Sequence, residues 1–205
     1  MDDWCAVHEF TQLLIPDPGD TDRWLYERFA TYYQYLLQAR AGIKTEQQAW
    51  QKMLEGFERG RKNNEYRYLS LQELSANMRN YGSFMRVYWS GTLFFLEADI
   101  ALRERSDGAQ SLDSVLKTFI QCCRPQRSYW QGSSLIDALD EASETGIFSD
   151  LYKRFQVAKA MPDYRPAFTK LGIDVKASKV NLDKRNEPSV HMRQSISLGL
   201  QKLTR

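Results

Sequence analysis

The sequence has few cysteines, little net charge and no long apolar run. Its three cysteines, of which Cys122 and Cys123 are adjacent, do not form a disulfide framework and match no CxxC metal motif, so we expect reduced core thiols. A net charge of +2 gives no indication of a nucleic-acid partner. No apolar stretch approaches the roughly 20 residues that a membrane span requires, and we therefore expect no membrane partner.

The N-terminus lacks the features of a secretory signal. Met1-Asp2-Asp3 is acidic, whereas a signal peptide begins with a positively charged segment. We therefore expect a cytoplasmic chain, an expectation that a signal on a longer parent protein would override. The 205 residues, 42% hydrophobic and 13% aromatic, fit one domain of ordinary size.

Helix signals occur almost throughout, and the period-two alternation of strands is nearly absent, which predicts an all-α fold. Capping boxes at Thr45 with Gln48 and at Ser70 with Glu73 mark two helix starts. The run from Ser83 to Arg105 is apolar over most of its circumference, which is typical of a helix buried at a domain centre. The other expected helices span residues 4–15 and run from a cap at Asp22 to Ala41. Three later helices are expected to be capped by Ser111, by Ser133 or Ser134 and by Ser149, and a last short helix is closed by Gly172.

The last 33 residues differ in composition from the rest. Residues 173–205 carry seven Lys or Arg against three Asp or Glu, with few large apolar residues and no clear period. Such a composition favours a loosely ordered basic tail. We therefore predict a packed helical domain over residues 1–172 and a tail over 173–205.

The first thirty residues contain an incomplete metal motif. In zinc peptidases two His four residues apart share one helix face, the Glu after the first His activates the metal-bound water, and a Glu on the next helix is the third ligand. Here His8 and Glu9 are present and Glu27 follows on the next expected helix, but Gln12 stands where the second His is needed. The pattern indicates a degenerate zinc site.

Two further stretches carry a family resemblance. Residues 24–33, WLYERFATYY, and residues 85–91, MRVYWSG, resemble the glycyl aminopeptidase family, peptidase family M sixty-one, which is similar in its core to thermolysin-like metallo-aminopeptidases. The resemblance runs from about residue 4 to Gly172. It implies a thermolysin-like helical metallopeptidase subdomain, a zinc cofactor, and a peptide substrate that loses an N-terminal glycyl or alanyl residue.

The resemblance also assigns roles to residues. It implies that His8 and Glu27 are zinc ligands, that Glu9 is the general base and that Tyr88 stabilises the oxyanion. Gln12 departs from the family pattern, and so does Arg28, which replaces the Gly that usually follows the ligand Glu. A side-chain amide oxygen suits calcium or magnesium better than zinc, so we expect weak zinc retention.

Each of these assignments has a structural alternative. A His–Glu pair on an amphipathic helix is, without context, more often packed or solvent-facing than metal-binding. Tyr88 on a buried helix fits a core aromatic equally well. Arg28 would either hold the two helices apart and compete with zinc for Glu27, or point to solvent in an ion pair with Glu27 or Asp22, worth about 0 to 1 kcal/mol.

Three other residues are weaker candidates. His191 is the only other histidine, and its place in the tail favours an exposed residue over a replacement metal ligand. Arg86 and Tyr81 would either line the cleft or serve as a surface partner and a core filler.

The family resemblance also concerns what precedes the motif. Family members carry a β-rich domain before the metal helix, with a substrate-amine site, and this chain starts at the metal helix. We expect an exposed apolar patch there and self-association through it. Two functions stay open: an impaired zinc aminopeptidase, and an inactive pseudopeptidase or fragment kept as a structural or binding module.

Overall fold

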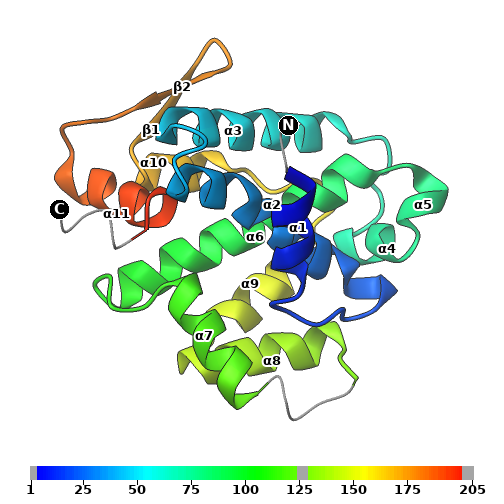
Figure 1. The fold of residues 1–205 in the computed structure, drawn as a ribbon. Coiled ribbons are helices and arrows are strands. Elements are labelled where there is room, and N and C mark those ends of the chain that lie inside the picture. Colours follow the sequence, from blue (N-terminus) through cyan, green and yellow to red (C-terminus); the bar gives the residue numbers. More distant parts are fainter. Residues whose placement is uncertain (1–3, 124–128, 200–205) are drawn as a thin grey trace.

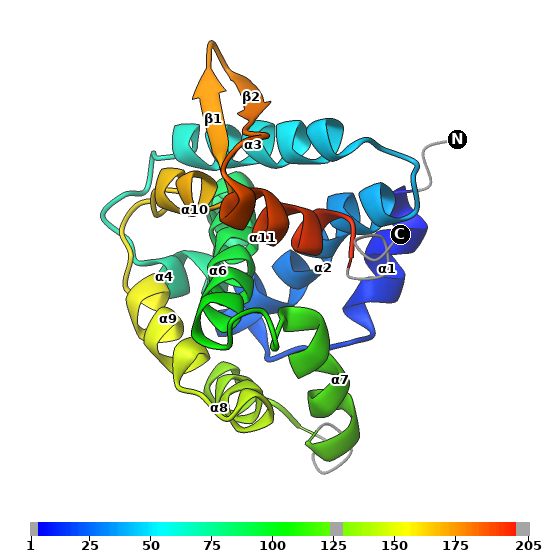
Figure 2. The same cartoon turned by 90° about the vertical axis from the view of Figure 1, so that its left-hand side faces the viewer.

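Helix α6 (Phe84–Arg105) runs through the middle of the molecule, and the other helices surround it (Figure 1). The computed structural model describes residues 4–123 and 129–199. Helices α2 (Arg23–Arg40), α3 (Glu46–Lys62) and α9 (Ile147–Gln156) pack directly against α6. Figure 2 shows α3 on one side of α6, with α9 and α2 on opposite flanks. The predicted helical fold and its buried central helix are confirmed.

The remaining elements complete this arrangement. They are α1 (Trp4–Gln12), the 3-10 turn η1 (Asp20–Asp22), α4 (Leu71–Ala76), α5 (Met78–Tyr81), α7 (Leu112–Cys122), α8 (Gly132–Ser143), α10 (Arg165–Lys170), β1 (Ile173–Lys176), β2 (Lys179–Leu182) and α11 (Glu187–Ser197). Within residues 4–123 and 129–199, none of the helices has the length and apolar character needed to cross a membrane.

The capping predictions are confirmed for three helices whose N-cap residue is a serine or threonine. Capping boxes form at Thr45, at Ser70 and at Ser111, where each side chain accepts the N–H three residues ahead. The expected capping hydrogen bond to the Asp22 side chain does not form. Asp22 precedes α2, but its carboxylate accepts from the Trp24 indole and the Tyr152 hydroxyl instead of capping the helix.

Two later helix starts also differ from the expectation. Helix α8 begins after Gln131, and Ser134 lies in its first turn, where its hydroxyl accepts from the Gln131 N–H. Helix α9 begins at Ile147, so Ser149 is already helical, and the Asp140 carboxylate accepts its N–H. A carboxylate from a neighbouring helix therefore does the capping that sequence reasoning gave to Ser149.

The N-terminal helix is shorter than expected. Helix α1 ends at Gln12, whereas the sequence predicted Ile15. Ile15 precedes Pro16, and the residue before a proline disfavours helical backbone. The buried side chain of Ile15 joins the core from the following turn.

Residues 173–199 depart from the expected loose tail. Strands β1 and β2 pair antiparallel from Ile173 with Leu182, and α11 packs against α2, α3 and α6. Arg193 is buried and donates to the carbonyls of Leu171 and Asp183, each over 2.8 Å. The basic composition suggested a solvated segment, but this arginine binds backbone carbonyls inside the fold.

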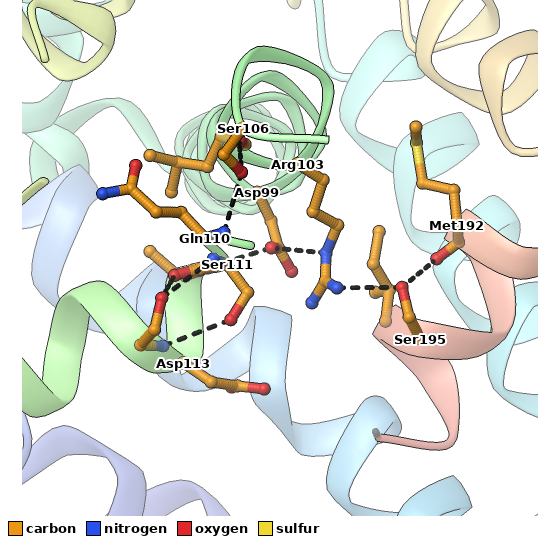
Figure 3. Close-up of polar contacts among 12 residues, drawn as sticks. Asp99, Arg103, Ser106, Gln110, Ser111, Asp113, Met192 and Ser195 are labelled. Atoms are coloured by element: carbon orange, nitrogen blue, oxygen red, sulfur yellow. Dashed lines mark hydrogen bonds and ion pairs between the residues drawn. The ribbon is translucent and has the colours of Figure 1, made fainter. Parts of the chain in front are cut away.

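A buried polar cluster ties α11 to the central helix (Figure 3). The Arg103 guanidinium donates to Asp99 over 2.9 Å and to Ser195 of α11 over 2.8 Å. Asp99 also accepts from the Leu112 N–H at the start of α7 and from the Tyr32 hydroxyl of α2. Helices α2, α6 and α7 therefore meet at the Asp99 carboxylate, and α11 joins them through Arg103.

The adjacent cysteines differ from the expectation of reduced thiols. Cys122 and Cys123 form a disulfide, with their Cα atoms 3.7 Å apart. The prediction of reduced core thiols is wrong for this pair. Neighbouring residues at the end of α7 close only a local ring, so the bond links no distant parts of the chain.

Candidate functional site

An open cavity of about 630 Å³ lies between α1, α2, α3 and α6. Helix α2 contributes Glu27, Thr31, Gln34 and Gln38, whose spacing of three or four residues places them on one helix face. This polar stripe was not among the predicted site residues. Its signal was a row of polar residues at helical spacing on a helix whose other buried residues are mostly apolar.

Three of the predicted site residues meet at one end of this cavity. The Gln12 amide nitrogen donates to Glu27 Oε2 over 3.2 Å and lies 3.2 Å from His8 Nε2. His8 Nε2 is 3.7 Å from the same Glu27 oxygen. The expected ligand positions therefore do converge, with the Gln12 amide between the imidazole and the carboxylate.

Arg28 adds a positive charge to this group. Its side chain is nearly buried, at 3% exposed, and its guanidinium lies over the Tyr88 ring. One terminal nitrogen is 3.7 Å from Glu27 Oε2, and the other donates to Thr31 over 3.4 Å. The alternative of a solvent-facing Arg28 is wrong, because the side chain turns inward toward α6.

Gly91 of α6 makes room for the Arg28 side chain. A methyl group at position 91 would collide with the Trp24 carbonyl oxygen and with the first side-chain carbons of Arg28. The two helices can therefore cross closely at this point. The close approach places the Tyr88 ring, one turn earlier on α6, beneath the guanidinium.

Glu27 and Arg28 both have pKa values that are shifted from the ordinary ones. Interaction with the His8 imidazole, helped by the charges of Arg28 and Arg23, lowers the pKa of Glu27 against the opposing effect of partial burial. Burial lowers the pKa of Arg28 to about 9, although Tyr88 and Glu27 favour its charged form. At neutral pH the cavity end therefore holds a carboxylate beside a desolvated guanidinium.

The donor set does not fit zinc. Catalytic zinc sites use three protein ligands from imidazole, thiolate or carboxylate groups, and this cluster offers one imidazole and one carboxylate. Residues 4–123 and 129–199 contain no group of three or more His, Cys, Asp or Glu positioned to hold a metal. The fixed charge of Arg28 beside Glu27 further opposes a divalent cation.

Of the predicted catalytic residues, Tyr88 lies at the cavity and Glu9 does not. Tyr88 lines the cavity and is half-buried, with its ring covered by Arg28. Glu9 is exposed and does not line the cavity. The structure therefore gathers His8, Glu27 and Tyr88 but leaves Glu9 outside.

The weaker candidates lie elsewhere. Arg86 is buried and donates to the carbonyls of Tyr66, Leu69 and Ala158, which makes it a structural residue. Tyr81 packs against the Tyr66 ring, 4.7 Å between centroids, and does not line the cavity. His191 is exposed on α11, as expected.

The rim of the cavity carries charged residues that were not among the predicted site residues. Lys44, Lys52, Glu55 and Arg59 line it from α3 and from the turn before α3. Lys52 pairs with Glu55 over 2.9 Å, and Arg59 lies over the Trp89 ring. These residues are far from the motif in sequence, and only the packing of α3 on α6 brings them to the site.

One comparison identifies a relationship. Residues 16–94, less than half of the chain, match the family model of the M61 glycyl aminopeptidases. This confirms the resemblance for the segment that includes Glu27, Arg28 and Tyr88, whereas His8, Glu9 and Gln12 precede it. No curated protein matches the chain.

Proposed function

We propose that this chain, whose residues 16–94 match the family model of the M61 glycyl aminopeptidases, is a pseudopeptidase that binds peptides in the cavity between α1, α2, α3 and α6 without hydrolysing them. The observation that carries the proposal is the environment of Glu27. Gln12 donates to its carboxylate, and the Arg28 guanidinium lies 3.7 Å away. A hydrogen bond and a positive charge thus satisfy the group that the family resemblance assigns to the metal.

Hydrolysis would also need a base that faces the substrate. Glu9, which the resemblance assigns to that role, is exposed and stands outside the cavity lining. A general base must lie within hydrogen-bond reach of the proton it removes. Among the residues that the structure describes, the arrangement therefore lacks a three-ligand metal site, and the base that the resemblance predicts, Glu9, does not face the cavity.

The cavity itself retains the character of a binding site. Its volume of about 630 Å³ lies within the roughly 300 to 1,000 Å³ typical of ligand pockets. Tyr35, Tyr88 and Trp89 provide apolar wall, and Thr31 and Gln34 provide hydrogen-bonding groups. Apolar walls with a few convergent polar groups suit a short stretch of peptide.

A second candidate is an impaired zinc aminopeptidase. The observation in its favour is that His8 and Glu27, the two retained ligand positions, remain 3.7 Å apart with Tyr88 at the same cavity. Activity in this case would require a third ligand from outside the cluster. The Gln12 amide that now occupies the missing position makes this the weaker candidate.

Metal content, hydrolysis and binding together separate the two candidates. We expect purified protein to hold no stoichiometric zinc, to hydrolyse glycyl and alanyl arylamides no faster than a His8→Ala variant, and to bind a mixed-sequence fluorescent peptide saturably. Zinc-dependent turnover that His8→Ala abolishes would establish the enzyme instead. Failure to bind any peptide would overturn the binding half of the proposal.

A further inference from the structure

Arg28 is a buried cation with unused hydrogen-bonding capacity. A guanidinium carries five N–H donors. The Nε–H of Arg28 has no acceptor among the residues that the structure describes, and its bond to Thr31 is long at 3.4 Å. A buried charged group normally has its donors satisfied, because leaving them unpaired costs free energy. Nε itself is closed off from solvent, but Arg28 lines the cavity, so an acceptor on a ligand there can approach its side chain.

Gln38 provides a second unsatisfied group on the same helix face. Its side chain is 7% exposed and lines the cavity, and its amide oxygen has no donor among the described residues. The backbone N–H of Lys44 donates to the Gln38 carbonyl, which places Lys44 next to it. Both unsatisfied atoms are closed off from solvent, so they show that this part of the cavity wall is polar and incompletely hydrogen-bonded, and they do not mark the atoms that a ligand touches.

The charges around the cavity favour an anion. Its lining holds four Lys or Arg and two Glu. The two carboxylates are balanced, because Glu27 lies beside Arg28 and Glu55 pairs with Lys52. Lys44 and Arg59 remain, and neither forms a salt bridge with a carboxylate in the described parts of the chain. The pKa of Glu55 is lowered mainly by Lys52 and to a smaller degree by the charge of Arg59. Cations that line a cavity raise the local concentration of anionic ligands.

We propose that the cavity recognises acidic peptides through a carboxylate that binds Arg28, with Lys44 and Arg59 attracting it from the rim. This rests on the proposed function, since it names the ligand of the same cavity. A carboxylate oxygen in the cavity accepts from the Arg28 guanidinium, and charge-assisted bonds of this kind are roughly twice as strong as neutral ones. The recognised group is opposite in charge to the peptide amine that the family resemblance predicts.

The test compares peptides that differ in one group. Fluorescence polarisation would measure four labelled heptapeptides of one sequence: central glutamate, glutamine or lysine with both ends blocked, and central glutamine with a free C-terminal carboxylate. We expect the glutamate peptide to bind at least about tenfold more tightly than the glutamine peptide, with the difference reduced by salt. The lysine peptide should bind most weakly. The fourth peptide shows whether a C-terminal carboxylate serves as well as a side chain.

Variants assign the effect to residues. Arg28→Gln should remove the preference for glutamate, and Arg28→Lys should restore part of it. Because Arg28 is buried, a second variant works from the surface: Lys44→Glu with Arg59→Glu should reverse the preference toward the lysine peptide. The matched control, Lys117→Gln, changes an exposed lysine on α7 outside the cavity and should leave binding unchanged.

The outcomes separate this inference from the proposed function. Equal binding of the glutamate, glutamine and lysine peptides, unaffected by Arg28→Gln and by the double charge reversal, would overturn carboxylate recognition while peptide binding without hydrolysis stands. Absence of binding by all four peptides would overturn both. A glutamate preference that survives both sets of variants would also refute the assignment to Arg28, Lys44 and Arg59.

Discussion

Two buried arginines of this protein should respond oppositely to removal of their charge. Arg28 and Arg103 are 3% and 4% exposed. Arg103 bonds to the buried Asp99 and to Ser195 over 2.9 and 2.8 Å (Figure 3), whereas Arg28 has a 3.4 Å bond to Thr31 and an unsatisfied Nε–H. We expect Arg28→Met to stabilise the protein and Arg103→Met to destabilise it.

The magnitudes follow from the two environments. Burial that lowers the pKa of Arg28 from its ordinary value to about 9 corresponds to roughly 5 kcal/mol against its charged form, an upper limit because the site relaxes. Replacing a buried ion pair by apolar side chains often stabilises by about 1 to 4 kcal/mol. Arg28→Met should gain about the lower end of this range, because its partner Glu27 is partly exposed and keeps the hydrogen bond from Gln12. Removing Arg103 leaves the Asp99 carboxylate, 1% exposed, without its counter-charge, which costs about 3 to 5 kcal/mol.

Urea denaturation followed by circular dichroism would measure both free energies of unfolding. Arg28→Met should move the midpoint to higher urea and Arg103→Met to lower urea, at an unchanged slope. A loss of stability in Arg28→Met as large as in Arg103→Met would refute the reasoning, because it would mean that the Arg28 guanidinium is well satisfied in the folded protein.

Three further predictions concern the same regions. Gly91→Ala should lower the free energy of unfolding by about 1 to 3 kcal/mol, since the added methyl group meets the Trp24 carbonyl; an unchanged urea midpoint would contradict this. The folded state lowers the pKa of Glu27 from 4.5, so its carboxylate adds stability that is present above that pH and is lost as the pH falls through the lower, folded-state value. The difference in melting temperature between wild type and Glu27→Gln should therefore shrink on acidification, and a difference independent of pH would count against it. Phe10 and Leu13 are 71% and 61% exposed, and we expect concentration-dependent self-association that Phe10→Ser with Leu13→Ser weakens; sedimentation of wild type as a monomer at high concentration would disprove it.

Local signals made the helical fold predictable. The capping boxes at Thr45 and Ser70 depend on residues three positions apart, and the apolar circumference of 83–105 depends on helical period alone. The docking of α11 depends on Arg193 binding the carbonyls of Leu171 and Asp183. Such bonds leave no periodic pattern in the sequence, so residues 173–199 read as a solvated segment.

The candidate site was predictable to a similar degree. The spacing of His8 and Gln12 on one helix, followed by Glu27 on the next, was enough to predict that they meet. The direction of Arg28 was not, because it depends on the space that Gly91 leaves where α6 crosses α2. The sequence showed the charge of Arg28, but only the packing shows that it lies inside the cavity.

Zinc titration tests the central claim most directly. Calorimetry would compare wild type with Gln12→His combined with Arg28→Met, a variant that restores an imidazole beside His8 and Glu27 and removes the adjacent charge. We predict no stoichiometric binding by wild type and one tightly bound zinc in the variant. Tight stoichiometric binding by wild type, abolished by His8→Ala, would contradict the claim that Gln12 and Arg28 have displaced the metal from this site.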